Sequence, residues 1–578
     1  MFKGLLSNIG KYKKYAILTP IMMVFEVLFE VAIPFVMALI IDKGIAIGVE
    51  QGNMSYVIEM GGLLILFALI ALLCGFFGGR FGALASTGLA KELRRKLFYK
   101  IQDFSFSNVD KFQTSSLITR MTIDVNMVQN AFMMSLRMLV RAPIMLTSAT
   151  IMAFIINARL ATVFIIVIPF LAFFLYLIFT KAHPYFRIML NKYDTLNNSI
   201  QENLIGIRVV KSFVREDYEI EKFKKSVKEL KDTSMSAEKI VILSSPVMQF
   251  TMYISIIVIA WFGAKLIITN LMQTGELMSF ITYITLVLMS LMMLSMTFIQ
   301  IIISRAASSR IVEVLQEEVE IKDGEDVDLR VKDGSIEYRD VCFSYVKNSE
   351  NYVLKNINLK IKSGEVIGIL GGTGSAKTTL VQLIPRLYDV SKGELIVGKM
   401  NVKNYSLRNL RKDVGIVLQK NVLFSGTIKE NLLWGNVNAT NEEIEEVCKV
   451  VQAHDFIMSF PEGYDMFLEQ GGTNLSGGQK QRLCIARALI ANPKILILDD
   501  ATSAIDTNTE AKIRVALKEK LKDTTVIIIA QRVNSVDGAD KVLILDEGEI
   551  DAFDTPKNLL ANNKIYQDLY FSQLKGGE

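Results

Sequence analysis

Long apolar stretches dominate the first half of the chain. Six of them cover about 16–41, 57–79, 137–156, 160–180, 240–264 and 278–303. Each approaches the roughly 20 residues that an α-helix needs to cross the hydrocarbon core of a bilayer. The pattern therefore predicts an α-helical membrane domain of six transmembrane helices within residues 1–310.

The polar segments between these stretches alternate in length and charge. Two long segments, 91–120 and 181–239, are rich in Lys and Arg, whereas the connections at 157–159 and 270–275 are short and nearly uncharged. Lys and Arg collect on the cytoplasmic side of membrane proteins. We therefore expect a multi-pass protein of the cell (plasma) membrane, with both termini and the second half of the chain in the cytoplasm.

The two long segments have the apolar spacing of helices. Ala90–Gln102 and Tyr193–Val214 contain few helix-breaking residues, so the spanning helices are expected to continue beyond the bilayer as cytoplasmic extensions. We expect the tips that contact the second half of the chain near Ser107–Ser116 and near Glu216–Phe223.

The composition agrees with a membrane protein. Hydrophobic residues make up 51% of the 578 residues and the mean hydropathy is +0.34, which is more than a soluble protein of this size needs. The net charge of +5 is small for this length. Because no basic patch with interleaved aromatic residues is present, nucleic acid is not an expected partner.

The sequence changes character after about Arg310. Residues 311–334 become acidic and lose apolar periodicity, as is typical of a linker. From Ser335 onward, short β-branched runs alternate with helical patterns, which predicts a soluble α/β domain over residues 335–578. Buried parallel strands are expected at Val366–Leu370, Ile495–Leu498 and Val526–Ala530.

A glycine-rich segment follows the first of these strands. It consists of Gly371, Gly372, Thr373, Gly374, Ser375, Ala376, Lys377, Thr378 and Thr379. A loop of this kind between a strand and a helix binds phosphate through backbone amides, with Lys377 at the terminal phosphates and the Thr378 hydroxyl on Mg²⁺. The pattern usually has Gly before the lysine, so we expect the methyl group of Ala376 to crowd the phosphates and weaken binding.

Two carboxylates end the second predicted strand. Asp499 follows four apolar residues and is expected to hold Mg²⁺, directly or through water. Asp500 comes next. The phosphate loop and this strand together predict a P-loop nucleotide-binding domain.

A third motif, Leu475–Arg482, lies between these two elements. With them, and in this order, it resembles the ATP-binding cassette superfamily, and the six spans make the whole chain similar to an exporter-type half-transporter. The resemblance implies ATP and Mg²⁺ as cofactors. It implies that Tyr345 stacks on adenine, that Gln419 contacts Mg²⁺ and the membrane domain, and that the loop Ser503–Asp506 crosses to an opposing subunit. Residues that would complete the opposing subunit's ATP site are Ser476, Gly477, Gly478 and Gln479.

Two positions depart from the family pattern. Asp500 stands where the family has Glu, and Gln531 stands where it has His. The shorter carboxylate lies about 1 Å farther from the water that it orients, a displacement that can cost about a hundredfold in rate. Glutamine can donate a hydrogen bond to the γ-phosphate but cannot carry a proton. We therefore expect an impaired, degenerate site, although tolerated drift in an active homodimer is the alternative.

The intact Ser476 motif beside a degenerate site suggests a heterodimer. A homologous partner half-transporter, with a consensus catalytic site, would use this motif to hydrolyse ATP. The resemblance is to bacterial heterodimeric exporters, many of them multidrug transporters, so the expected activity is ATP-driven export of drugs or other amphipathic compounds. Alternatives are a lipid or peptide exporter subunit and a non-transporting subunit that senses nucleotide.

Two carboxylates lie within the first span. Glu26 and Glu30 are four residues apart and share a helix face. Because intramembrane carboxylates are costly, they are candidates for attracting cationic amphipathic substrates. They could equally be structural, paired through a shared proton or with Arg80 or Arg137.

Overall fold

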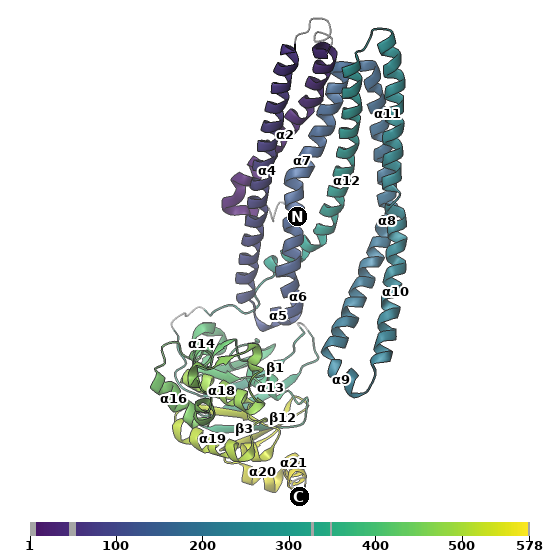
Figure 1. The fold of residues 1–578 in the computed structure, drawn as a ribbon. Helices are drawn as coiled ribbons and strands as arrows, with labels where there is room; N and C mark the ends of the chain where they lie inside the picture. Colours follow the sequence, from purple (N-terminus) through teal and green to yellow (C-terminus); the bar gives the residue numbers. More distant parts are fainter. Residues whose placement is uncertain (1–6, 46–53, 325–328, 347–348, 576–578) are drawn as a thin grey trace. The chain divides into compact units, whose positions relative to one another are not determined.

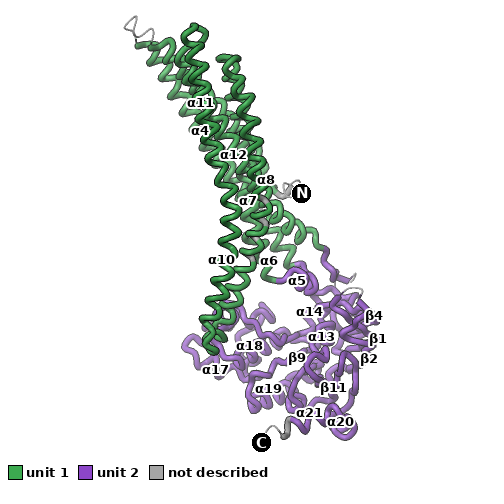
Figure 2. Tube along the Cα trace, turned by 90° about the vertical axis from the view of Figure 1, so that its right-hand side faces the viewer, with its two compact units in different colours: residues 1–102, 114–317 green, residues 103–113, 318–578 purple. Residues whose placement is uncertain are grey.

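The computed structural model describes residues 7–45, 54–324, 329–346 and 349–575. The chain forms two compact units, residues 1–102 with 114–317 and residues 103–113 with 318–578 (Figure 2). The short segment 103–113 therefore belongs with the C-terminal part of the chain. The predicted domain limits at 310 and 334 stay predictions.

The regular structure described in the first unit is helical (Figure 1). Its helices α2, α4, α7 and α12 pack together, and α8, α10 and α11 lie alongside one another. Their bounds are η1 Ser7–Tyr12, α2 Lys13–Leu39, η2 Ile40–Ile45, α4 Ser55–Gln102, α6 Thr114–Thr119, η3 Arg120–Asp124, α7 Val125–Ile156, α8 Ala158–Ile205, α9 Ile207–Ser212, α10 Glu216–Val241, α11 Ser244–Ile268 and α12 Thr274–Gln316.

Among the residues that the structure describes, six helices are long and apolar enough to cross a membrane. Each contains one of the six predicted spans, which confirms the membrane fold. They cover Ile9–Ile45, Ser55–Gln102, Thr114–Ile156, Ala158–Ile205, Glu216–Ile268 and Thr274–Gln316. All six exceed the roughly 20 residues that a bilayer requires, so the helices continue beyond their apolar stretches as expected.

Hydrogen bonds to Asp42 of η2 and from Tyr283 tie α12 to α2 and the turn that follows it. The Asp42 carboxylate accepts hydrogen bonds from the backbone amides of Gly275 (2.5 Å) and Glu276 (3.1 Å). These amides have no partner within the helix, so an acidic side chain stabilises the helix start. Tyr283 donates to the Val31 carbonyl oxygen at 2.8 Å, which satisfies a buried hydroxyl.

The second long extension turns before the range predicted for its tip. Helix α8 ends at Ile205, Gly206 follows, and α9 (Ile207–Ser212) forms the tip. The predicted tip, Glu216–Phe223, instead forms the first turns of α10. Hydrogen bonds and ion pairs join α8 to α10, including Lys192–Glu229 at 2.7 Å.

The second unit is a mixed α/β structure. Its six-stranded sheet has the order β12-β11-β3-β10-β9-β6, in which only β12 runs antiparallel, and a four-stranded antiparallel sheet has the order β2-β1-β4-β5. The strands are β1 Ile336–Phe343, β2 Leu354–Ile361, β3 Val366–Leu370, β4 Lys392–Val397, β5 Met400–Asn401, β6 Val414–Val417, β7 Gly426–Thr427, β8 Phe467–Leu468, β9 Ile495–Asp499, β10 Thr525–Ile529, β11 Lys541–Asp546 and β12 Glu549–Asp554. The three predicted strands are confirmed to within one residue.

Helices surround these sheets in the second unit (Figure 1). They are α5 Phe106–Phe112, α13 Lys377–Gln382, α14 Leu407–Asp413, α15 Ile428–Leu433, α16 Asn441–Val450, α17 His454–Met458, α18 Gly477–Ile490, α19 Thr507–Lys520, α20 Pro556–Asn562 and α21 Lys564–Lys575.

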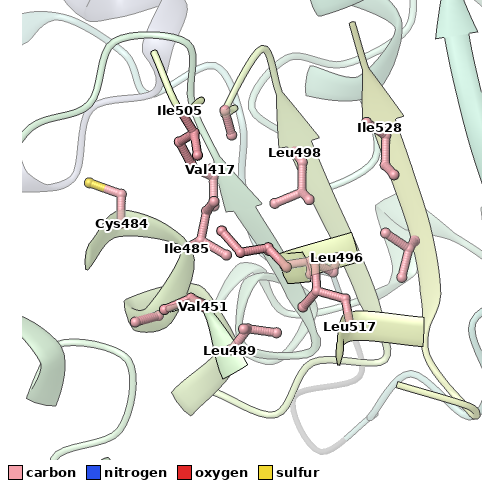
Figure 3. Close-up of a cluster of buried hydrophobic side chains, with 14 of the residues drawn as sticks. Val417, Val451, Cys484, Ile485, Leu489, Leu496, Leu498, Ile505, Leu517 and Ile528 are labelled. Carbon is pink, nitrogen blue, oxygen red and sulfur yellow. The ribbon is translucent and has the colours of Figure 1, made fainter. Parts of the chain in front are cut away.

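Alternation along the central strands explains their continuous apolar runs. Leu496 and Leu498 of β9 face one buried cluster, whereas Ile495 and Ile497 face another. The first cluster also contains Ile485 and Leu489 of α18 (Figure 3). Because successive side chains of a strand point to opposite faces, a parallel sheet covered on both faces needs apolar residues at every position. This packing on both faces fixes the carboxyl ends of the parallel strands at one edge of the sheet.

Candidate functional site

Two glycines give the phosphate loop its shape. Gly371 has a φ of +154°, and a Cβ atom on it would lie 2.1 Å from the Leu545 carbonyl oxygen. Gly374 has a φ of +86°. Glycine adopts such conformations without a steric penalty. The loop between β3 and α13 therefore requires glycine at both positions.

Ala376 also has a left-handed backbone, with φ +69° and ψ +23°. An L-residue with a side chain pays about 1 kcal/mol or more for this conformation. Its methyl group packs against the apolar cluster that includes Leu380. The structure thus adds backbone strain to the predicted crowding as a reason why alanine is unfavourable here.

Lys377 folds over the loop. Its Nζ donates to the carbonyl oxygens of Gly371 (2.9 Å) and Gly372 (2.7 Å) and lies 3.3 Å from the Ser375 hydroxyl. Burial lowers the pKa of Lys377, and the carboxylates of Asp499 and Asp500 partly oppose this shift. The ammonium group is thus held among the backbone groups that would surround a phosphate.

Thr378 and Asp499 lie together, as predicted. The Thr378 hydroxyl donates to Asp499 Oδ1 at 3.0 Å. Asp499 Oδ2 is buried without a hydrogen-bond partner among the described residues. Burial raises the pKa of Asp499. The buried Oδ2 of Asp499, which accepts no hydrogen bond from the described residues, and the neighbouring Thr378 hydroxyl are hard oxygen ligands. Such ligands suit Mg²⁺.

The two departures from the family pattern contact each other. Gln531 Nε2 donates to Asp500 Oδ2 at 3.1 Å. The Gln419 side chain also hydrogen-bonds Asp500, and both bonds oppose the increase in the pKa of Asp500 that burial causes. Asp500 has a φ of +50° and donates its backbone N–H to the Ile529 carbonyl oxygen. Its carboxylate is thus held by two amide side chains.

Tyr345 lies at the other end of the phosphate loop. It is 48% exposed, and its hydroxyl is 3.0 Å from the Thr379 hydroxyl. Its ring packs edge-on against Phe343 and Tyr388, with centroid distances of 4.9 Å and 5.2 Å. The residue therefore keeps exposed surface for stacking on a base.

Ser476 begins α18. Its hydroxyl accepts from the Gln479 amide, and Gln479 Oε1 accepts from the Ser476 amide at 2.9 Å. A Cβ atom on Gly478 would lie 2.9 Å from the Ala504 carbonyl oxygen. This capping box satisfies the orphan amides at the helix start, and Ser476 and Gly477 are exposed to solvent.

The predicted site residues thus form two groups. Lys377, Thr378, Asp499 and their neighbours share one hydrogen-bonded site, whereas no hydrogen bond among the described residues joins Ser476 to it directly. Gln481, on the same helix α18, donates to the Ser503 hydroxyl (3.2 Å), which in turn donates to the Asp500 backbone carbonyl oxygen (3.1 Å).

The membrane unit contains a charge cluster around Glu26 and Glu30 of α2. Arg141 of α7 donates one guanidinium nitrogen to Glu26 and the other to Glu30 of α2, the latter at 2.7 Å. Of the alternatives for these carboxylates, pairing with Arg80 or Arg137 is wrong, because the cation that contacts them is Arg141. Arg137 lies four residues before Arg141, one turn earlier on the same helix. An arginine partner was therefore predictable, but which of the two arginines contacts the carboxylates was not.

Comparisons with known proteins agree with this architecture. A model of the ABC transporter transmembrane region matches residues 17–316, and an ABC transporter model matches residues 354–503. An uncharacterised ABC transporter ATP-binding protein of Bacillus subtilis is 36% identical over 568 residues, covering 98% of each chain.

Two further relatives have names that state an activity. One, from Staphylococcus aureus, is provisionally named a multidrug export ATP-binding/permease protein and is 32% identical over 582 residues, covering 99% of this chain and 100% of its own. The other is an ATP-dependent lipid A-core flippase of Syntrophus aciditrophicus, 32% identical over 503 residues, covering 87% and 83%. With its six spans fused to an ATP-binding domain, this chain belongs to the ABC transporter family and is an exporter-type half-transporter of the membrane.

Proposed function

We propose that this chain is the degenerate-site subunit of a heterodimeric ABC exporter. The observation that carries the proposal is the contact between Asp500 and Gln531 at 3.1 Å. Both positions that normally orient water and contact the γ-phosphate have changed, and the replacements bind each other. A carboxylate held by amide donors is a weaker acceptor for a water proton, and this slows hydrolysis at this site.

The groups that hold nucleotide remain in place. Lys377 would contact the β- and γ-phosphates, Tyr345 would stack on adenine, and Thr378 with Asp499 would hold Mg²⁺. When bound, Mg²⁺ neutralises charge that develops on the phosphates. The expected behaviour is tight ATP binding with slow turnover.

The intact Ser476 motif gives the partner its role. In the proposed dimer, Ser476, Gly477 and Gly478 complete the ATP site of a homologous subunit that retains Glu and His. His454 does not take the place of the missing histidine, because it begins α17, where its Nδ1 lies 3.0 Å from the Tyr464 hydroxyl. Hydrolysis would therefore occur at the partner's site.

The proposed orientation places both termini and residues 335–578 in the cytoplasm, joined to the membrane domain by the linker 311–334. It rests on the Lys- and Arg-rich long segments. Two ATP-binding domains would bind nucleotide more tightly when closed against each other than when apart. This difference in nucleotide affinity would favour the arrangement of the spans that accompanies closure.

The substrate class is proposed to be amphipathic, with drugs favoured by the Staphylococcus aureus relative and lipids by the flippase. Glu26 and Glu30 place two carboxyl groups beside one guanidinium group, so this cluster would attract a cationic substrate. Their shared ion pair also supports a structural role.

A pair of substitutions tests the asymmetry in the reconstituted complex. Ser476→Arg should lower the ATPase and transport rates of the pair more than about tenfold, because it disrupts the partner's site. Asp500→Asn should change them less than about threefold. If both substitutions abolish activity equally, the two sites are equivalent and the proposal is wrong. If the pair binds ATP but transports none of a panel of cationic dyes and lipids, a sensing subunit becomes the better account.

A further inference from the structure

A cavity of about 290 Å³ lies between α19 and one face of the six-stranded sheet. Leu498 of β9 and Ile528 of β10 line it from the sheet, and Leu517 lines it from α19; all three belong to the buried cluster in Figure 3. Asp499 follows Leu498 in the strand, so its side chain points to the opposite face, where it meets Thr378. A ligand in this cavity would therefore not occupy the nucleotide site.

The walls of the cavity are apolar. Ile513, Leu517 and Leu521 recur every four residues along α19 and the turn that follows it, so they share one helix face. Val526 and Ile528, two residues apart in β10, face the cavity from the sheet. All of these side chains except Leu521 are buried. Cavities with such walls exclude water and take up apolar molecules.

A row of cations borders this apolar surface. Arg514, Lys518 and Lys522 also recur every four residues, one position after the apolar row, and all three line the cavity. Arg514 already donates to the Asn534 carbonyl oxygen. Lys518 Nζ lies 3.4 Å from the Gly538 carbonyl oxygen, a long and therefore weak hydrogen bond. Both lysines are exposed, so two ammonium groups at the rim are accessible to a ligand.

The acidic residues at the cavity have other contacts. Glu510 Oε1 accepts from the Thr502 hydroxyl at 2.7 Å, and Asp540 Oδ2 accepts from the first backbone amide of β3 at 2.8 Å. Asp537 lies close to Tyr566, whose pKa is raised by burial and then by the charge of Asp537. The two rim lysines are therefore the charged groups best placed to bind a ligand.

We propose that this cavity binds a medium-chain fatty acid anion, with its carboxylate between Lys518 and Lys522 and its chain against Leu517 and Ile528. The basic rim selects an anion, and the apolar walls select an unbranched hydrocarbon chain. The volume of about 290 Å³ holds about ten non-hydrogen atoms at about 30 Å³ each, which is the size of octanoate. The inference goes beyond the proposed export function and does not depend on it.

A bound anion would also contact the segment that follows the second carboxylate. Thr502, which lines the cavity, comes two residues after Asp500, and its carbonyl oxygen accepts from the Ile505 amide at 3.0 Å. Its hydroxyl joins this segment to Glu510 of α19. A ligand that packs against α19 makes local opening of this region rarer, so hydrogen exchange of residues 510–522 reports occupancy of the cavity.

The test measures this exchange in the full-length chain in lipid nanodiscs, with octanoate as the probe and without nucleotide. Octanoate should slow the exchange with a Kd of about 1 mM or lower. Octanamide, which has the same size and no charge, should bind about tenfold more weakly. Equal Kd values for the two probes would contradict the assignment to an anion. Unchanged exchange at about tenfold the expected octanoate Kd would overturn the site as a whole.

Substitution of the two rim lysines tests where the carboxylate binds. Lys518→Gln/Lys522→Gln should raise the octanoate Kd about tenfold and leave the octanamide Kd unchanged, because both side chains are exposed. Lys512→Gln, at an exposed position of α19 outside the cavity lining, is the matched control and should change neither Kd. Leu521→Trp fills the apolar space and should abolish binding of both probes. An octanoate Kd that the double lysine variant leaves unchanged, or binding that Leu521→Trp retains, would refute the proposal.

Discussion

Replacing Arg141 by methionine tests whether the charge cluster in the membrane unit is structural. The guanidinium group contacts two carboxylates, and the side chains of Glu26 and Glu30 are 13% and 31% exposed. Removing one partner of a largely buried ion pair leaves the other charge uncompensated, at a cost of about 3 kcal/mol at the lower end of measured values. Arg141→Met leaves two carboxylates on one helix face with no cation.

Glu30→Gln provides the internal comparison. The amide oxygen can still accept from Arg141, and the remaining Glu26–Arg141 pair has no net charge. The expected cost is about 1 kcal/mol, the value of one hydrogen bond. With about 2–4 °C per kcal/mol for a unit of this size, Arg141→Met should lower the melting temperature by about 6–12 °C and Glu30→Gln by about 2–4 °C.

The chain supplies its own reporter for this assay. Cys74 lies in α4, and the other three cysteines, Cys342, Cys448 and Cys484, are buried and free in the second unit. With those three changed to alanine, a thiol-reactive fluorophore reports exposure of Cys74 as the membrane unit unfolds. Arg137→Met is the matched control on the same helix. If the melting temperatures of Arg141→Met and Arg137→Met differ by less than about 2 °C, the charge cluster does not stabilise the membrane unit.

Three further predictions concern the phosphate loop and the neighbouring carboxylate of Asp499. Gly371→Ala should reduce ATP binding by about tenfold or more because of its φ and the clash with Leu545, whereas Gly372→Ala, whose Cβ would meet no atom within 4 Å, should bind normally in an equilibrium assay. Ala376→Gly should raise ATP affinity by relieving backbone strain; unchanged affinity would show that the strain has no functional cost. Folding favours protonated Asp499, so its contribution to stability is present at acidic pH and lost as pH rises through its raised pKa. Mg²⁺-ATP needs the ionised form and should therefore raise the melting temperature more at about pH 8 than at about pH 5.5; equal increases would contradict this.

The sequence predicts those parts of the molecule that depend on local patterns. The six spans follow from the length of apolar runs, and β3, β9 and β10 follow from short β-branched runs, because each signal lies within the element itself. The phosphate loop is likewise a contiguous motif. The identity and order of these elements were enough to predict the family.

Contacts between distant segments were not predictable in this way. The choice of Arg141 over Arg137 depends on how α2 and α7 are rotated against each other, and the hydrogen bond from Tyr388 to Asp110 joins residues 278 positions apart. The φ of Ala376 is set by loop closure. The position of the turn in the second extension was likewise not predictable, because Gly206 ends α8 before the predicted range begins.

ATP turnover by the purified chain without a partner tests the central claim most directly. Wild type should hydrolyse ATP very slowly, although it binds nucleotide. Asp500→Glu/Gln531→His restores both family residues in the chain that also carries an intact Ser476 motif, and it should raise turnover by about a hundredfold. A wild-type rate equal to that of the double variant would contradict the degenerate site and would support an active homodimer.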